Sequence, residues 1–189
     1  MTGYGEDMKT TLALVLMFLS PAAFADAVAV SSGTISLVPI KAETAKVPAT
    51  ITGVTGSVDL EKGTGTLTIP VGAWDSGLEV RDHNVRTAFF QAAANPTVTF
   101  ELESLSLTQG AGKAKGTLRM YSGAVPVEAE VKVSTDEQGL TQVVTTQPFS
   151  VSISALGLSE QLVALMALCA HPSVADAVEI SVALTLAAE

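Results

Sequence analysis

The chain has 189 residues, the size of a single domain with a substantial core, and no long linker is evident in its middle. Its 10 Lys and Arg are scattered among 19 Asp and Glu, a net charge of -9, so the basic patch that nucleic-acid binding requires is missing. Apolar residues make up 48% of the chain and are mostly Val, Ala, Leu and Ile in alternating segments, which is typical of an all-β protein.

The N-terminal segment has the features of a secretory signal peptide. From Met8 it combines one lysine, an apolar run over residues 12–19 and an Ala-Phe-Ala end at residues 23–25 that suits signal peptidase. We therefore expect residues 1–25 to be removed on export to the periplasm, with translation starting at Met8 because the preceding segment is acidic. The run is shorter than the ~20 apolar residues of a membrane-spanning helix, so no membrane anchor is expected after cleavage.

The first half of the exported chain predicts three strands. Residues 28–38 and 49–60 are rich in Thr, Val and Gly, and apolar side chains alternate with polar ones in the second segment. Lys62 and Gly63 form a turn, and the segment 66–69 returns as the third strand of a hairpin.

The second half predicts five more strands, and its alternation is clearer. Between residues 125 and 133 every second residue is Val or Ala, while Glu128, Glu130 and Lys132 occupy the other face. The other segments with a strand pattern are residues 97–103, 117–121, 149–154 and 178–186.

About eight strands with one apolar face each must bury those faces against one another. An antiparallel barrel does so and also removes the free edges of the sheet, whereas a two-sheet sandwich is the competing fold. A barrel of this strand number has room for packed side chains or for one elongated apolar ligand.

Residues 159–170 interrupt the strand pattern with SEQLVALMALCA, which predicts an apolar helix capped by Ser159 and ended by Pro172. Its apolar residues lie on nearly every side, so we expect other elements to cover the helix. Core packing as a plug of the barrel end is favoured over a mobile lid on a lipid cavity, and a contact in a homodimer is the third alternative. Cys169 is the only cysteine, which rules out an intrachain disulfide.

Residues 77–100 form a corner in which charged residues, paired aromatics and a proline are crowded between two strands. We expect a short helix over residues 82–94, capped by Asp82 and ended before Pro96, that delivers Phe89 and Phe90 to the barrel. Arg81, Asp82 and Arg86 are close enough in sequence to pair with one another or with Glu79.

This corner resembles the YceI family, the exported lipid-binding β-barrels of bacteria. The matching residues are Asp75-Ser76-Gly77, Arg81-Asp82, Val85, Phe89-Phe90 and Pro96-Thr97-Val98-Thr99-Phe100. A weaker likeness extends over nearly all of the chain that follows the signal peptide. The family histidine falls at position 84, where this chain has Asn84, while His83 stands one place earlier.

The resemblance implies one domain over residues 26–189, an extended, lipocalin-like antiparallel barrel that holds a polyisoprenoid lipid, such as an isoprenoid quinone. The candidate ligand-binding residues are Trp74, Phe89, Phe90, Phe100, Met120 and Phe149. Plain packing at the barrel end is the alternative for the aromatic residues. For the polar group of Arg81, Asp82 and Arg86, a salt-linked corner is favoured over a head-group site in which arginine donates to a quinone carbonyl.

The sequence carries no catalytic motif such as G-x-S-x-G or a glycine-rich phosphate loop, so an enzyme is not expected. His83 and His171 are too isolated to predict a metal site, and no cofactor is expected beyond a bound isoprenoid lipid. Two hypotheses remain. One is a periplasmic carrier of a long apolar lipid, and the other is a filled barrel that acts as an accessory or interaction protein of the cell envelope.

Overall fold

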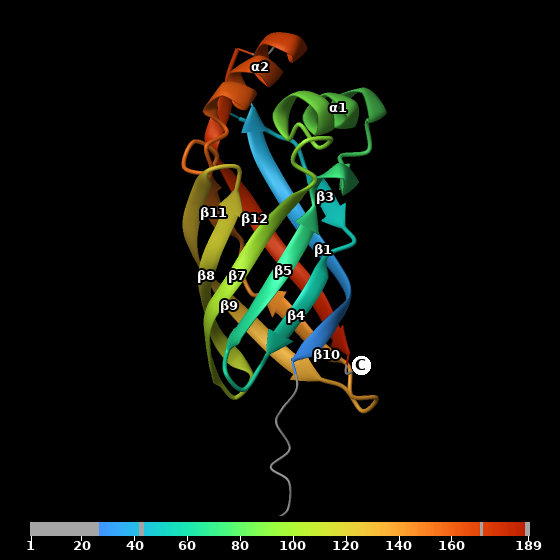
Figure 1. Ribbon diagram of the computed structural model, residues 1–189, viewed down its shortest axis with the longest axis vertical. Helices are drawn as coiled ribbons and strands as arrows, with labels where there is room; N and C mark the ends of the chain where they lie inside the picture. The colour runs from blue at the N-terminus through green and yellow to red at the C-terminus, as the bar shows by residue number, and fades with distance from the viewer. Residues whose placement is uncertain (1–26, 42–43, 171, 188–189) are drawn as a thin grey trace, which may run out of the picture.

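The computed structural model describes residues 27–41, 44–170 and 172–187, so the predicted signal peptide lies outside the described residues. These residues form an elongated barrel with helices gathered at one end (Figure 1). The strands are β1 (Val28–Lys41), β2 (Ala45–Lys46), β3 (Ala49–Thr52), β4 (Thr55–Asp59), β5 (Thr64–Pro70), β6 (Trp74–Asp75), β7 (Thr97–Thr108), β8 (Ala111–Met120), β9 (Gly123–Thr135), β10 (Thr141–Thr145), β11 (Phe149–Ser152) and β12 (Val174–Ala187). The helical segments are η1 (Val71–Ala73), α1 (Glu79–Asn84), η2 (Val85–Phe89) and α2 (Ser159–Cys169).

Strand β9 shows how the sequence pattern becomes a barrel wall. Val127, Ala129 and Val131 are buried, whereas Glu128 and Glu130 between them are exposed. Because successive side chains of a strand point to opposite faces, this alternation gives β9 one face for the barrel interior and one for solvent.

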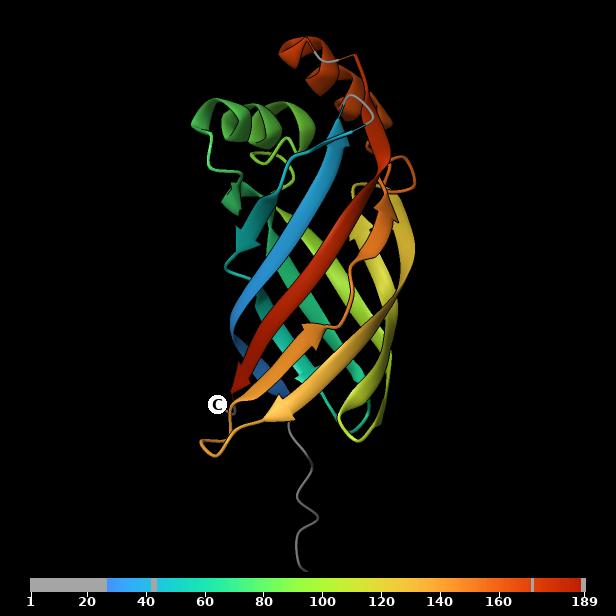
Figure 2. The same cartoon turned by 180° about the vertical axis from the view of Figure 1, so that it is seen from behind.

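Eight strands close into a ring of antiparallel neighbours, in the order β1, β4, β5, β7, β8, β9, β10 and β12. The ring closes where β12 pairs with β1, from Ala29 opposite Ala187 to Lys41 opposite Val174. Figure 2 shows these two long strands side by side. Closure pairs the edges that an open sheet would leave free. The predicted antiparallel barrel of about eight strands is confirmed, and the sandwich is wrong.

Most predicted strands differ from the observed ones only in their ends, but two differ in more than that. The segment 49–60 is divided at Gly53, whose φ of 72° breaks the extended backbone, into β3 and β4, and both pair with β1. The predicted strand 149–154 becomes β11, which pairs with β12 alone, while the ring is completed by β10, a strand that the sequence pattern did not indicate.

The corner helix begins earlier than predicted, whereas the second helix lies where it was predicted. At the corner, α1 begins at Glu79 and η2 ends at Phe89, so the predicted span 82–94 is shifted toward the N-terminus. Asp82 does not cap the helix but lies inside it. Ser159 is the first residue of α2 rather than its cap, and the helix ends at Cys169, before Ala170 with its φ of 52°.

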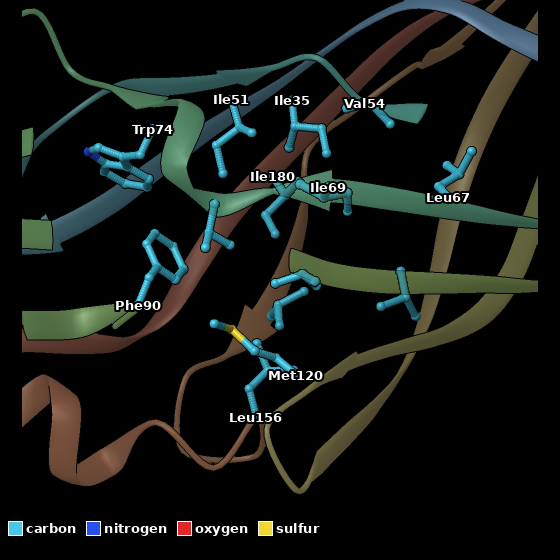
Figure 3. Close-up of a cluster of buried hydrophobic side chains, with 14 of the residues drawn as sticks. Ile35, Ile51, Val54, Leu67, Ile69, Trp74, Phe90, Met120, Leu156 and Ile180 are labelled. Carbon is cyan, nitrogen blue, oxygen red and sulfur yellow. The ribbon is translucent and has the colours of Figure 1, made fainter. Parts of the chain in front are cut away.

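Buried apolar side chains line the inside of the barrel along its length. Figure 3 shows Ile35, Ile51, Ile69 and Ile180 projecting from different strands toward one another, with Trp74 and Phe90 at the helix end. Because β3 pairs with β6, which places Trp74 opposite Ile51, the indole is held over this end of the interior. The fold thus sets aromatic side chains at one mouth of the barrel.

Candidate functional site

An apolar cavity of about 240 Å³ occupies the barrel interior. All eight strands of the ring contribute side chains to its lining. Val85, Phe89 and Leu162 bound it at the helix end, whereas Leu105 and Ala114 line it near the β7–β8 turn, so the cavity extends along the barrel. The barrel is therefore hollow and not filled by its own side chains.

All six predicted ligand-binding residues line this cavity: Trp74, Phe89, Phe90, Phe100, Met120 and Phe149. Met120 is buried and flexible, which lets a thioether adapt to the shape of a neighbour. Phe100 turns inward across Gly116, where a Cβ would lie 2.7 Å from the ring, so this glycine makes room for the aromatic side chain. The structure brings the six residues together, and their contact with a ligand stays a prediction.

The aromatic group at the helix end is positioned by unusual local backbone. Phe90 donates its N–H to the carbonyl of Val85 over 2.9 Å, a bond between residues five apart, and this wide π-helical turn places Val85, Phe89 and Phe90 all on the cavity. The rings of Phe89 and Phe90 meet edge to face at 4.9 Å, and those of Phe90 and Trp74 are 5.7 Å apart. The corner thus supplies a rigid aromatic wall.

The polar residues of the corner hold its backbone. Asp82 is buried, and its carboxylate accepts hydrogen bonds from the Ser76 N–H, at 2.9 Å, and from the Ser76 hydroxyl. Arg81 donates to the hydroxyl and carbonyl oxygens of Ser76, at 2.7 and 2.9 Å. Arg86 donates to the carbonyl of Asp82 and pairs with Glu79 at 3.2 Å. None of the three predicted polar residues lines the cavity. Of the predicted pairings, the structure shows the ion pair of Arg86 with Glu79, while Arg81 and Asp82 bond to Ser76 instead.

Two opposing effects act on the Asp82 carboxyl. Burial alone raises its pKa, but the hydrogen bonds from Ser76, with smaller contributions from Trp74 and Arg86, hold the pKa of Asp82 below its usual value. The buried Nε1–H of Trp74 makes no hydrogen bond of ordinary geometry with a described residue, yet it is near enough to this carboxylate to favour the charged form. The carboxylate is therefore ionised at neutral pH and serves as a structural acceptor.

Comparison with known proteins identifies the family. The model of the YceI-like domain matches residues 27–186. The chain belongs to the YceI family. No curated protein matches the sequence.

Solved structures show the same fold as this YceI chain. A polyisoprenoid binding domain from Saccharophagus degradans, implicated in plant cell wall breakdown, is 15% identical with a TM-score of 0.75, over 86% of this chain and 98% of its own. BcnA of Burkholderia cenocepacia is 19% identical with a TM-score of 0.63, over 81% and 95% of the two chains. A Campylobacter jejuni YceI protein is 14% identical with a TM-score of 0.59, over 77% and 87%. At such identities these similarities establish the fold alone.

Asn84, which stands where the YceI resemblance places a histidine, contacts the second helix. Its Nδ2 donates to the sulfur of Cys169 at 3.6 Å, which joins α1 to the last turn of α2. The two residues are 85 positions apart, and nothing in the sequence indicates this contact.

Helix α2 covers the cavity with one face and leaves the other exposed. Leu162 and Leu158, the residue just before the helix, are buried and line the cavity, whereas Val163 and Leu168 are 61% and 59% exposed. Other elements therefore cover only one side of this helix, and the expected cover is incomplete. Leu158, Leu162 and Thr145 were not among the predicted site residues. The leucines could have been found from the apolar character of the helix, but no signal marked Thr145.

Thr145 brings one of the few polar side-chain atoms of the described lining to the cavity. Its Oγ1 accepts a hydrogen bond from the backbone N–H of Val182 at 3.0 Å, so it substitutes for a backbone partner where β10 ends. The interior consequently offers little to a polar ligand group. No three His, Cys, Asp or Glu of the described chain gather as metal ligands, and none of its described helices is long and apolar enough to cross a membrane.

Proposed function

We propose that this YceI protein binds a long apolar lipid, a polyisoprenoid or an isoprenoid quinone, inside its barrel and carries it in the periplasm. The hollow apolar interior carries the proposal. Similarity of fold to the polyisoprenoid binding domain of Saccharophagus degradans supports the same class of ligand. Membership of the YceI family likewise favours a binding protein over an enzyme.

The size and lining of the cavity suit a hydrocarbon chain. Its volume of about 240 Å³ exceeds the ~150 Å³ of an apolar cavity that stays dry and binds benzene, and is just under the ~300 Å³ at which small-molecule pockets begin. Each buried methylene of a ligand contributes about 0.8 kcal/mol. A prenyl chain inserted along the barrel axis gains this contribution repeatedly and meets almost no polar group.

The same lining determines where a polar head would lie. A carbonyl or phosphate taken into an apolar interior without a hydrogen-bond partner costs several kcal/mol, roughly 2–7 for an uncharged group. The head of the lipid therefore stays at an end of the barrel, and the chain alone occupies the cavity. A filled barrel that acts only as an accessory protein would have no space of this kind.

The periplasmic location is part of the proposal and has its support in the sequence. The apolar run and Ala-Phe-Ala end of the first 25 residues suit signal peptidase. Expression of the full chain in a Gram-negative host should yield periplasmic protein whose N-terminal residue is Asp26. Retention in the cytoplasm with an uncleaved N-terminus would contradict this location.

Ligand binding is tested on protein purified from that host without detergent. Native mass spectrometry should show an added mass, and organic extraction should release an isoprenoid lipid of that mass. The matched control is the same protein after extraction, incubated with a purified prenyl quinone, which should restore the added mass. A bare polypeptide mass in both samples would refute the proposal.

A further inference from the structure

The end of the barrel opposite the helices is closed by packed side chains. On β12, every second residue from Val178 to Leu184 lines the cavity, and Leu186 is the next residue on that face. Leu186 is 0% exposed and does not line the cavity, so protein encloses its side chain on all sides. Its partner on β10, Thr141, is buried as well. In Figure 2, β12 ends at the end of the barrel opposite the helices, so the cavity stops above a filled layer there.

A bulge in β7 places a second large side chain at this end. The pairing of β7 with β8 shifts between Leu102 and Ser104, so one residue of β7 has no partner on β8. In a regular strand Ser104 would follow Leu102 on the inner face, but after the bulge Leu105 lines the cavity instead. Ala114, directly opposite Leu105 on β8, lines it too. The bulge thus turns a leucine rather than a hydroxyl into the interior.

The β4–β5 turn packs against the bulged strand. Asp59 holds this turn, because its carboxylate accepts the N–H of Lys62 at 2.8 Å and its carbonyl accepts the N–H of Gly63 at 2.9 Å. A Cβ at Gly63, whose φ is 68°, would lie 2.6 Å from the backbone nitrogen of Leu105, so only glycine permits this close approach. Leu60, in the same turn, lines the cavity. The turn therefore closes the barrel beside Leu105.

We call Leu60, Leu105 and Leu186 the barrel floor. These residues belong to strands of the ring or to the turn that joins two of them, so the floor cannot move aside without breaking the ladders on both sides. The other end of the cavity is bounded by η2 and α2, which are not strands of the ring. A lipid chain in the cavity consequently has its free end at the floor and its head at the helix end.

We infer that the barrel floor sets the length of the lipid chain that this protein prefers. The inference rests on the proposed function, because it concerns the chain that the cavity would hold. Each isoprene unit buries several methyl and methylene groups, so it should strengthen binding at least tenfold while the cavity has room for it. Once the chain reaches the floor, a further unit stays outside the cavity and adds nothing. The affinity should therefore rise with chain length and then reach a plateau.

The test uses prenyl quinones that differ only in chain length. They are added to the full-chain protein after extraction of its lipid, and competition in native mass spectrometry gives their relative affinities. Leu105→Ala lowers the floor and should move the plateau to the next longer chain, which should bind at least tenfold tighter than to the wild type. Ala114→Leu fills the same level and should move the plateau to a shorter chain.

Leu107→Ala is the matched control. Leu107 lies on the same strand but is 38% exposed and does not line the cavity, so this variant should keep the wild-type plateau. Urea denaturation shows which variants fold. Leu60→Ala lowers the floor from the turn instead of from β7, and it takes the place of Leu105→Ala if that variant does not fold.

Plateaus that move in opposite directions in the enlarged and the filled variant would support the role of the floor. An affinity that keeps rising with chain length in the wild type would overturn this role, and so would one unchanged plateau in all folded variants. Either result leaves lipid binding itself intact, which separates the two proposals. A wild type that binds none of the quinones would refute the proposed function and the role of the floor together.

Discussion

Phe89 and Phe90 are adjacent in sequence but differ in what surrounds them. Both rings line the cavity, but Phe90 is buried between Trp74 and Phe89, whereas Phe89 is partly exposed. A ring enclosed by protein contributes mostly to folding, and a partly exposed ring on the cavity wall is free to contact a ligand. Substitution of Phe90 should therefore affect mainly the stability of the protein, and substitution of Phe89 mainly ligand binding.

Phe90→Ala is expected to lower the free energy of unfolding by about 3–5 kcal/mol, the range for a large aromatic in a core. Phe89→Ser should cost less stability but reduce lipid retention about tenfold, equivalent to 1.4 kcal/mol of binding. Urea denaturation and the bound fraction in native mass spectra measure the two effects. A folded Phe89→Ser variant with the wild-type lipid content would remove Phe89 from the site.

The charged carboxylate of Asp82 stabilises the corner. Its pKa is lowered in the folded protein, so it contributes stability at pH values above its unfolded pKa, near 3.8, and this contribution is lost as the pH falls through the folded value. Asp82→Asn should lower the free energy of unfolding at pH 7 by about 1–3 kcal/mol, because the Ser76 donors lose a charged acceptor. The difference between wild type and variant should shrink below about pH 4. Denaturant titrations at pH 7 and pH 3 measure it, and a constant difference would contradict this role.

At the scale of elements, the helices at the mouth are held in different ways. The corner of α1 and η2 is tied to the barrel by hydrogen bonds at Ser76, Asp82 and Tyr121. Helix α2 is held by Leu162, Leu165 and Met166, which pack on the core, and its side-chain hydrogen bond to α1 is the weak one from Asn84 to the sulfur of Cys169. If one helix moves to admit a chain, it is therefore α2.

Asn84→Cys should place a second thiol beside Cys169, within reach of oxidation to a disulfide or of a short crosslinker, since the Nδ2 of Asn84 lies 3.6 Å from the Cys169 sulfur in the wild type. The oxidised variant should release its lipid to acceptor vesicles at least tenfold more slowly than the reduced one, because the mouth is closed covalently. Asn84→Cys/Cys169→Ser, which has no partner thiol, should be insensitive to oxidant. A short bismaleimide joins the thiols if the disulfide does not form. Equal release rates with the crosslink in place would show that the chain leaves elsewhere.

At the scale of the whole molecule, small residues keep the barrel hollow. Ala114 on β8 and Ala129 on β9 are paired directly opposite each other, and both line the cavity. Two methyl side chains at adjacent positions of the wall leave space that Leu or Phe would occupy. This pair is where the interior is most easily filled.

Ala129→Phe should occupy part of the cavity and lower the bound lipid at least tenfold. Overpacking of the interior should also lower the free energy of unfolding by about 1–3 kcal/mol. Ala124→Phe, at an exposed position of the same strand, is the control and should bind lipid like the wild type. Lipid content and melting temperature of both variants are the measurements. Unchanged binding by a folded Ala129→Phe variant would place the ligand outside the barrel.

The alternation of apolar and polar residues was enough to predict the barrel, because each strand with a single apolar face must bury it. Strand β10 was missed because TQVVT is short and lacks a clear alternation, and it is recognisable only by its pairing with β9 and β12. Asp82 was predicted as a cap because its position before an apolar pattern suits that role. Its actual partner is Ser76, six residues earlier, and only the folded chain brings the two together.

The sequence by itself determined the all-β class, the aromatic corner and the family, since these depend on local patterns along the chain. Tertiary structure alone decided that the barrel is hollow, because a cavity depends on how side chains from eight strands fill a shared volume. It also decided that α2 buries one face and exposes the other. An apolar helix gives no local sign of which side meets the core, so this division is settled only by the packing of α2 on the barrel.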